Sequence, residues 1–373
     1  MISRRLVGIA VRDTALTHLK AIAFVMFVLL VVAIAIDLTR FLDDLREKLA
    51  AQDLAFVPTF AKYLLYRATD IIAHLLPLAC LTGSFVAELL RHQRMEPVIL
   101  ASAGAPPTVF FASMFAVGIA AGSVQVALEV WLRPAAVGVQ AQLGIGGYGH
   151  RYRPGTLGTY WFVENDIAII ARVVRDDPPE LQELRMFSGV GTPALTKVVE
   201  ARSAKPIDKD LWRLHDAVVW EGQSGSAMLP QSHETLETIL PLTQTQVRNH
   251  RVAGFVLPNS VLWDIASIEG NSRSSEVETA VMRRFTAIFL PGIFAFLGAT
   301  LSQCGRNGRF FAWWKLLVLG TLGYIMVVSV KSFWTLSEFE VLTPLVATSL
   351  PMLAAFVLAS ILQVRLNGLP SRS

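Results

Sequence analysis

Six strongly apolar stretches constrain the fold of this 373-residue chain more than any other feature of its sequence. An α-helix needs about 20 residues to cross the roughly 30 Å of hydrocarbon in a bilayer, and most of the stretches approach or exceed that length. They do not show the alternation of polar and apolar residues that is typical of barrel strands. The sequence therefore predicts six transmembrane helices, at residues 19–36, 71–90, 109–132, 285–303, 311–333 and 341–364.

A long polar insert divides these helices three and three. We expect a polytopic α-helical membrane protein in three parts: residues 1–134 with the first three helices, residues 135–280 as a soluble domain, and residues 281–373 with the last three helices. The 53% of hydrophobic residues in the chain agrees with this class and disagrees with an ordinary soluble domain.

Lysine and arginine residues predict which side of the membrane each loop occupies, because cytoplasmic loops carry an excess of them. The excess lies before the first helix, after the second, after the fourth and at the C-terminus. The residues are Arg4, Arg5, Arg12, Lys20, Arg91, Arg94, Arg306, Arg309, Lys315, Arg365 and Arg372. These segments are predicted to be cytoplasmic and the insert to lie on the other side, although the loop after the first helix is also rich in basic residues.

Several binding functions are not expected from the sequence. The net charge of +4 arises in the membrane-flanking segments, since residues 135–284 hold 15 Lys and Arg against 17 Asp and Glu, so no nucleic-acid surface is expected. No G-x-x-x-x-G-K-[ST] phosphate loop occurs, so if ATP drives this protein, another chain must bind the ATP. The seven histidines lack metal-ligand spacing, and neither a metal nor a cofactor is expected.

Two charged pairs lie near the ends of predicted helices. Asp70 and His74, four residues apart, fit either an intramembrane proton relay or, more simply, a helix-end pair. Glu129 and Arg133 have the spacing of an i,i+4 ion pair, and a charge at that depth must face the bundle interior.

Gly118 and Gly122 lie four residues apart in the third helix. Small residues at this spacing let another helix approach closely. The neighbour is expected to be a helix of the same chain or, less simply, a helix of another subunit.

The insert has the pattern of short β-strands. Residues 159–163 and 167–174 are rich in Val, Ile and aromatic residues and flank Glu164-Asn165-Asp166, which predicts a hairpin. Further strands are expected at 184–187, 195–201, 212–220 and 226–229, and this spacing favours a sandwich or jelly roll. Residues 235–275 give no clear pattern, and a helix over 276–284 is expected to lead back to the membrane.

A short cytoplasmic element is predicted over residues 91–104. Pro97 suits the first helical position, Glu96 lies beside the positive helix N-terminus, and Gly104 suits the position after the helix end. A two-turn helix with one apolar face is too short to be stable alone, so we expect it to dock into a partner unless it is an ordinary loop. The docking residues are predicted to be Arg94, Glu96, Pro97, Val98, Ile99 and Leu100.

Segments along nearly the whole chain resemble one known family. They are Phe-Leu-Asp-Asp-Leu at 41–45, Pro-Leu-Ala at 77–79 with Gly83, Gln-Arg-Met-Glu at 93–96, Ala-Ser-Ala-Gly at 101–104, Glu129 with Pro134, Trp-Arg-Leu at 212–214, Pro344, and Leu-Pro at 350–351. Together with the order of helices and insert, they resemble the LptF/LptG (YjgP/YjgQ) family, the permease subunits of the bacterial lipopolysaccharide exporter. The C-terminal pattern is more similar to the LptG-like member.

The resemblance implies a role in transport across the bacterial envelope. The chain would lie in the inner membrane, pair with a second LptF/LptG-type permease, and sit on a dimer of cytoplasmic ABC ATPase subunits. Lipopolysaccharide would enter a cavity between the two helical bundles, and ATP-driven closure would move it onto periplasmic jelly-roll domains. Bridge proteins similar to LptC and LptA would then receive it.

Two groups of residues are candidates for binding such a lipid. Basic side chains at the outer helix ends suit its phosphates, although snorkelling to ordinary headgroups explains any one of them equally well. They are Arg40, Arg133, Arg283, Arg284 and Lys331, and Asp37 and Glu129 are spaced to pair with the first two. In the insert, Phe162, Ile167 and Ile169 are predicted to line a path for acyl chains, and the edge of their hairpin is predicted to add a strand from the next protein.

Two other functions fit the same pattern. A three-plus-three arrangement is also typical of ion-coupled secondary transporters built from inverted repeats, although the first and fourth helices show no matching break. A non-transporting envelope assembly or signalling protein with a partner-binding β-domain is the other alternative. Co-purification of an ATPase would separate the exporter from both.

Overall fold

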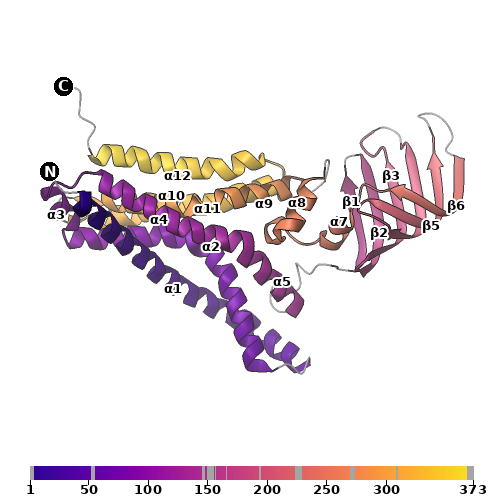
Figure 1. Cartoon of the computed structure of the whole chain (residues 1–373), viewed down its shortest axis with the longest axis horizontal. Coiled ribbons are helices and arrows are strands. Elements are labelled where there is room, and N and C mark those ends of the chain that lie inside the picture. Colours follow the sequence, from indigo (N-terminus) through magenta and orange to yellow (C-terminus); the bar gives the residue numbers. More distant parts are fainter. Residues whose placement is uncertain are drawn as a thin grey trace. The chain divides into compact units, whose positions relative to one another are not determined.

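The computed structural model describes residues 4–51, 55–144, 148, 155, 157–164, 166–192, 195–222, 229–268, 274–307 and 310–367. The chain forms two compact units, a helical unit made of Met1–Val139 with Thr279–Ser373 and an inserted unit of Gln140–Glu278 (Figure 1).

The helical unit contains the long apolar helices. Its elements are α1 (Arg4–Ala51), α2 (Phe56–Gln93), α3 (Glu96–Ser102), α4 (Thr108–Ala127), a π-helical turn (Leu128–Leu132), α5 (Arg133–Leu143), α9 (Ser274–Thr286), α10 (Leu290–Cys304), α11 (Trp313–Glu338) and α12 (Pro344–Asn367). Two short antiparallel strands of two residues each, β7 (Arg306–Asn307) and β8 (Phe310–Phe311), lie between α10 and α11.

Five spans of the described residues are long and apolar enough to cross a membrane, and α9 with α10 forms a sixth that is bent by 61°. The predicted class, a polytopic helical membrane protein with an inserted β-domain, is confirmed. The fourth helix was predicted over residues 285–303, but the structure breaks it between α9, which ends at Thr286, and α10, which begins at Leu290. Pro291 lies in the first turn of α10, where it has no N–H for a helical bond and its ring would clash with the carbonyl of residue 287. Because α1 continues unbroken from Arg4 to Ala51, the paired breaks of an inverted repeat are not found in these two spans.

Helix α10 is the centre of the helical unit. Phe294, Leu297 and Ala299 are fully buried, and α10 packs against α2, α4, α11 and α12. Gly118 and Gly122 of α4 lie against Gly292 and Ile288, so the close approach predicted for the two glycines occurs within this chain's own bundle.

The inserted unit is built on one antiparallel sheet whose strands follow chain order. They are β1 (Gly158–Glu164), β2 (Ile167–Asp176), β3 (Pro179–Ser188), β4 (Lys197–Pro206), β5 (Leu211–Glu221) and β6 (Leu229–Ile239). The hairpin predicted at 159–174 is β1 and β2, with Phe162 opposite Ile169; its turn residue Asn165 lies outside the described residues. Of the strand predicted at 226–229, residues 226–228 lie outside the described residues, and Leu229 is the first residue of β6.

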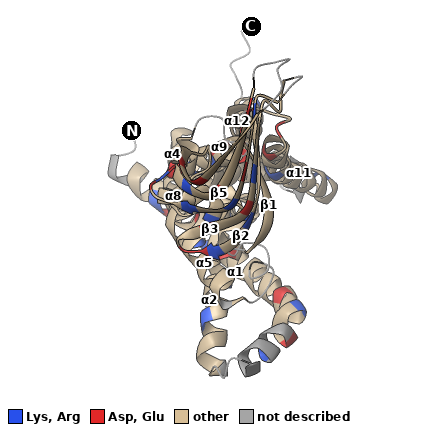
Figure 2. Ribbon diagram, turned by 90° about the vertical axis from the view of Figure 1, so that its right-hand side faces the viewer, with Lys and Arg blue, Asp and Glu red and all other residues tan. Residues whose placement is uncertain are grey.

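One face of the sheet forms the core of the inserted unit. Ile169, Leu181 and Leu214 are buried there together with Trp212, whose indole Nε1 donates to the carbonyl of Leu242 at 2.7 Å. Leu242 leads into α7 (Gln244–Asn249), followed by a 3₁₀ turn (Gly254–Val256) and α8 (Asn259–Ala266). The strands also carry charges of both signs (Figure 2), and cross-strand pairs such as Arg185–Glu200 at 3.1 Å and Arg213–Glu237 at 2.8 Å stabilise the solvent side.

Candidate functional site

The short helix predicted after α2 is present as α3. Pro97 occupies its first turn, and Gly104 follows the helix end with a φ of 81° that suits glycine. None of its seven residues is buried. Val98 and Ile99 are 45% and 60% exposed, so the helix presents an apolar surface that the described part of the chain leaves uncovered.

Glu96 at the start of α3 is engaged within the chain. Its carboxylate accepts from Arg91 Nε at 3.2 Å and lies 3.8 Å from Arg94 Nη1. Its side chain is still 31% exposed, so a further cation from outside has access to it. The link to Arg91 was not predicted, because it crosses the turn between two helices.

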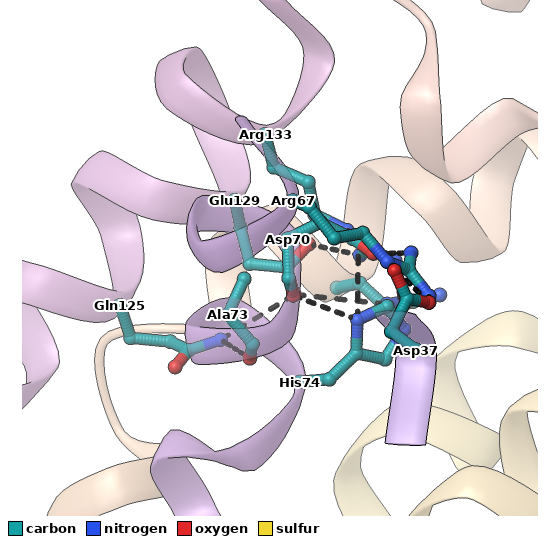
Figure 3. Close-up of polar contacts among 9 residues, drawn as sticks. Asp37, Arg67, Asp70, Ala73, His74, Gln125, Glu129 and Arg133 are labelled. Carbon is teal, nitrogen blue, oxygen red and sulfur yellow. Dashed lines mark hydrogen bonds and ion pairs between the residues drawn. The ribbon is translucent and has the colours of Figure 1, made fainter. Parts of the chain in front are cut away.

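A cluster of buried charges around Asp70, in the middle of α2, joins several helices (Figure 3). Arg133 is fully buried at its centre. Its Nε donates to Asp70 at 3.0 Å and its Nη1 to Glu129 at 3.0 Å, which confirms the predicted i,i+4 pair. Its Nη2 lies 2.9 Å from His74 Nε2.

Arg67 extends the cluster to α1. Its guanidinium donates to Asp37 at 2.6 Å and to Asp70 at 3.0 Å, and the Tyr63 hydroxyl also donates to Asp37 at 2.8 Å. The expected pairing of Asp37 with Arg40 is therefore replaced by contacts between helices. This difference arises because Asp37 is buried and faces α2.

Arg283 extends the cluster to α9 and α11. Its Nη2 lies 3.8 Å from Glu129, and its guanidinium stacks 4.0 Å above the ring of Trp334. The π-helical turn that carries Glu129 adds a residue to the helix at this point; such turns are frequent at functional sites.

The ion pairs described above contain equal numbers of positive and negative charges. Asp37, Asp70 and Glu129 supply three negative charges, and Arg67, Arg133 and Arg283 supply three positive ones. A buried charge is costly unless it is paired and hydrogen-bonded.

His74 fits this cluster as a neutral side chain. With its proton on Nδ1, the ring donates to the Asp70 carbonyl at 3.0 Å and accepts from Arg133 at Nε2. Both nitrogens are then satisfied, which favours a structural pair over a proton relay.

The five basic residues predicted to hold lipid phosphates fall into two groups. Arg133 and Arg283 belong to the buried cluster. Arg40 and Lys331 are exposed and Arg284 is half-buried.

The inserted unit places its predicted lipid-contacting residues on the core face. Ile169 is 1% exposed, Phe162 is buried opposite it on β1, and Ile167 is partly buried against the same core. Trp161 and Val163 point to the other face, where they are exposed. Strand β1, which carries these residues, is an edge of the sheet.

The fold and these sites define a class of protein: a multi-pass helical membrane protein with an inserted β-domain and a short uncovered helix between two spans. A family model described as "Lipopolysaccharide export system permease LptF/LptG" matches residues 17–365. The chain belongs to this family, and the resemblance seen in the sequence is confirmed. The model covers both members, so the preference for the LptG-like one stays a prediction. A search of curated proteins gave no significant match.

Proposed function

We propose that this chain is a permease subunit of an ATP-driven transporter that extracts lipopolysaccharide from the inner membrane and passes it to a periplasmic bridge. The observation that carries the proposal is α3: an ordered helix of seven residues with no buried side chain. A helix this short is not stable in isolation, so its exposed apolar surface suits a partner. In an exporter permease, that partner is the ATPase subunit, and a second permease completes the pair.

The proposed ATPase contact consists of Arg94, Glu96, Pro97, Val98, Ile99 and Leu100. Val98 and Ile99 supply apolar area, and the partly exposed Glu96 accepts a basic side chain of the partner while Arg91 holds it from behind.

Lipid phosphates are proposed to bind first to Arg40, Lys331 and Arg284, whose side chains reach solvent or lipid. Arg133 and Arg283 contribute only by exchange, because a phosphate must replace Glu129 or Asp70 as their anionic partner. The basic residues are therefore of two kinds: those proposed to contact the lipid first, and Arg133 and Arg283, whose ion pairs hold helices together.

The inserted β-domain is proposed to lie in the periplasm and to receive the acyl chains on its core face. Phe162 and Ile169 belong to the same hydrophobic core as Leu242 and Val247. A lipid is proposed to reach them when the segment around Leu242 and Val247 separates from the sheet. The free edge of β1 is the proposed site of strand addition by an LptC- or LptA-like bridge protein.

Charge reversal at α3 tests this function. A Glu96→Lys variant is co-expressed with the second permease and the ATPase, and the amount of ATPase that co-purifies should fall about tenfold or more. The introduced lysine would face the proposed basic side chain of the partner, and juxtaposed like charges cost several kcal/mol. ATP-dependent release of lipopolysaccharide from proteoliposomes should fall with the ATPase content. Asp13→Lys, an equal change at an exposed position of α1, is the control and should retain both. Normal ATPase content and lipid release in Glu96→Lys would refute the proposed function.

A further inference from the structure

We infer that a buried ion pair between Glu88 and Arg91 holds α3 in place and transmits its displacement to α1, α10 and α12. The inference rests on the proposed function, since it takes α3 to be the element on which a partner acts. Arg91 and Glu88 are therefore positioning residues, and neither is expected to touch the lipid or the nucleotide.

Arg91 connects α3 to two other helices. Its side chain is 6% exposed, and each edge of its guanidinium has a different partner. Nε donates to Glu96 of α3 at 3.2 Å, Nη1 to Glu88 of α2 at 2.9 Å, and Nη2 to the Thr14 hydroxyl of α1 at 3.1 Å. Only the planar fork of arginine makes these three contacts together.

Glu88 continues the connection into the bundle. It is 1% exposed and accepts from Gln303 of α10 at 2.8 Å. Gln303 in turn accepts from Gln363 of α12 at 3.0 Å. A continuous series of hydrogen bonds therefore runs from the first residue of α3 to the last turns of α10 and α12.

Two histidines add to the cluster around Glu88. His18 Nε2 of α1 lies 3.5 Å from Glu88 Oε2, and His92 Nε2 lies 3.4 Å from Oε1. His18 Nδ1 lies 2.9 Å from the Thr14 carbonyl, a distance at which it can donate a hydrogen bond to that oxygen. The other ring nitrogen then points at the Glu88 carboxylate. The Glu88 carboxylate is thus enclosed by groups from three helices, so its position depends on all of them.

The described residues pack only partly against α3. No residue of α3 is buried, and a cavity of about 490 Å³ lies beside it. Leu100 and Ala101 of α3 line this cavity on one side, and Glu88, Gln303 and Leu366 line it on others. Among the described residues, the hydrogen bond from Arg91 to Glu96 links α3 to the helices that line the other sides of this cavity.

Neutral variants of the pair test the inference in the assembled complex. Arg91→Gln and Glu88→Gln are made in the full chain with its second permease and ATPase, and lipopolysaccharide released per ATP hydrolysed is measured. Each variant should keep ATPase binding and lower this ratio about tenfold, the scale on which coupling networks respond to mutation. Arg12→Gln, which removes an exposed arginine of α1 near Thr14, should leave the ratio unchanged.

Measuring the distance between α3 and α12 distinguishes a loss of the mechanical link between them from general misfolding of the variants. Spin labels on unnatural amino acids at Ser102 of α3 and Arg365 of α12, both exposed, leave the native cysteines in place. The unmodified complex should give a narrow distance distribution, and both single variants a broad one. Normal coupling with a narrow distribution in either variant overturns the inference while the proposed function stands. If the unmodified complex releases no lipid on ATP hydrolysis, both are overturned.

A double variant protects the test against misfolding, because truncating one partner of a buried pair leaves an uncompensated charge. The double variant Glu88→Gln with Arg91→Gln removes both charges of the pair, so neither residue leaves an uncompensated charge. The inference requires that this variant assembles and remains uncoupled. A double variant that assembles and exports normally overturns it.

Discussion

Glu164 shows how one side chain in the inserted unit makes stability depend on pH. It ends β1, is 6% exposed, and accepts a hydrogen bond from Gln246, the residue that completes the capping box of α7. Burial raises the pKa of Glu164 from its ordinary value of 4.5 to about 7, although the hydrogen bond from Gln246 opposes this shift. Between these values the folded protein binds more protons than the unfolded chain. The stability contributed by this group is therefore complete below about pH 4.5 and is lost as the pH rises through 7.

We expect the contact between β1 and α7 to loosen between pH 5 and pH 8, by at most about 1.4 kcal/mol per pH unit. Amide hydrogen exchange of β1 and α7 in the full-length protein, corrected for intrinsic exchange rates, measures this. Glu164→Gln keeps an acceptor for Gln246 and should flatten the pH profile while raising protection at pH 8. Glu237→Gln, a change at an exposed carboxylate of β6, should leave the profile as it is. A profile that persists in Glu164→Gln would assign the pH dependence to another group.

At the scale of the elements, α4 lies close to the break between α9 and α10, and the spacing of Gly118 and Gly122 predicted such a close approach. A Cβ added at Gly122 would overlap the carbonyl of Ile288, a backbone atom that has no alternative rotamer. Gly122→Ala should therefore lower the stability of the detergent-purified protein by about 1–3 kcal/mol, the usual cost of overpacking.

Gly320 of α11 provides the matched control for this prediction. Nothing lies within 4 Å of a Cβ added there. Gly320→Ala should be neutral or stabilise the protein by about 1 kcal/mol or less, because alanine is the better helix former. Thermal unfolding of both variants measures the difference. Equal melting temperatures for Gly122→Ala and the parent chain would show that α4 has room to move.

Local signals in the sequence were sufficient to predict some elements and not others. The bounds of α3 follow from Pro97 and Gly104, which act within one turn, and the spans follow from length and hydropathy. Strand β6 was missed because it is a polar edge strand whose residues are mostly exposed, so it has no apolar alternation. The Asp37–Arg67 and Arg91–Glu96 pairs were missed for another reason, since they depend on how helices pack and turn against each other. Glu129–Arg133 and Asp70–His74 have the i,i+4 spacing of neighbours on one helix face, which reveals their contacts.

At the scale of the whole molecule, α2 carries one polar cluster near each end of its apolar part. Asp70 and Glu88 are 18 positions apart in a continuous helix, which is about 27 Å along its axis. That length is close to the thickness of the hydrocarbon core, so the two clusters fall near opposite membrane surfaces. This arrangement suits a permease that meets an ATPase on one side and the headgroup of a lipid on the other, with one helix joining the two events.

The lipid path proposed for the inserted unit can be followed by photo-crosslinking in membranes that actively export lipopolysaccharide. Benzoylphenylalanine in place of Phe162 keeps an aromatic side chain on the core face, and the same residue in place of Trp161 lies one position away on the exposed face. Because neighbouring residues of a strand point to opposite faces, the two positions sample different surfaces of one edge strand. We expect Phe162 to capture lipopolysaccharide only when ATP is supplied, and Trp161 to capture little of it. Capture at Ile167, which is partly buried on the same side as Ile169, should follow Phe162. Equal capture of lipid at Phe162 and Trp161, or capture that does not depend on ATP, would place the acyl chains outside the core face and leave the edge of β1 as the only route by which this unit serves export.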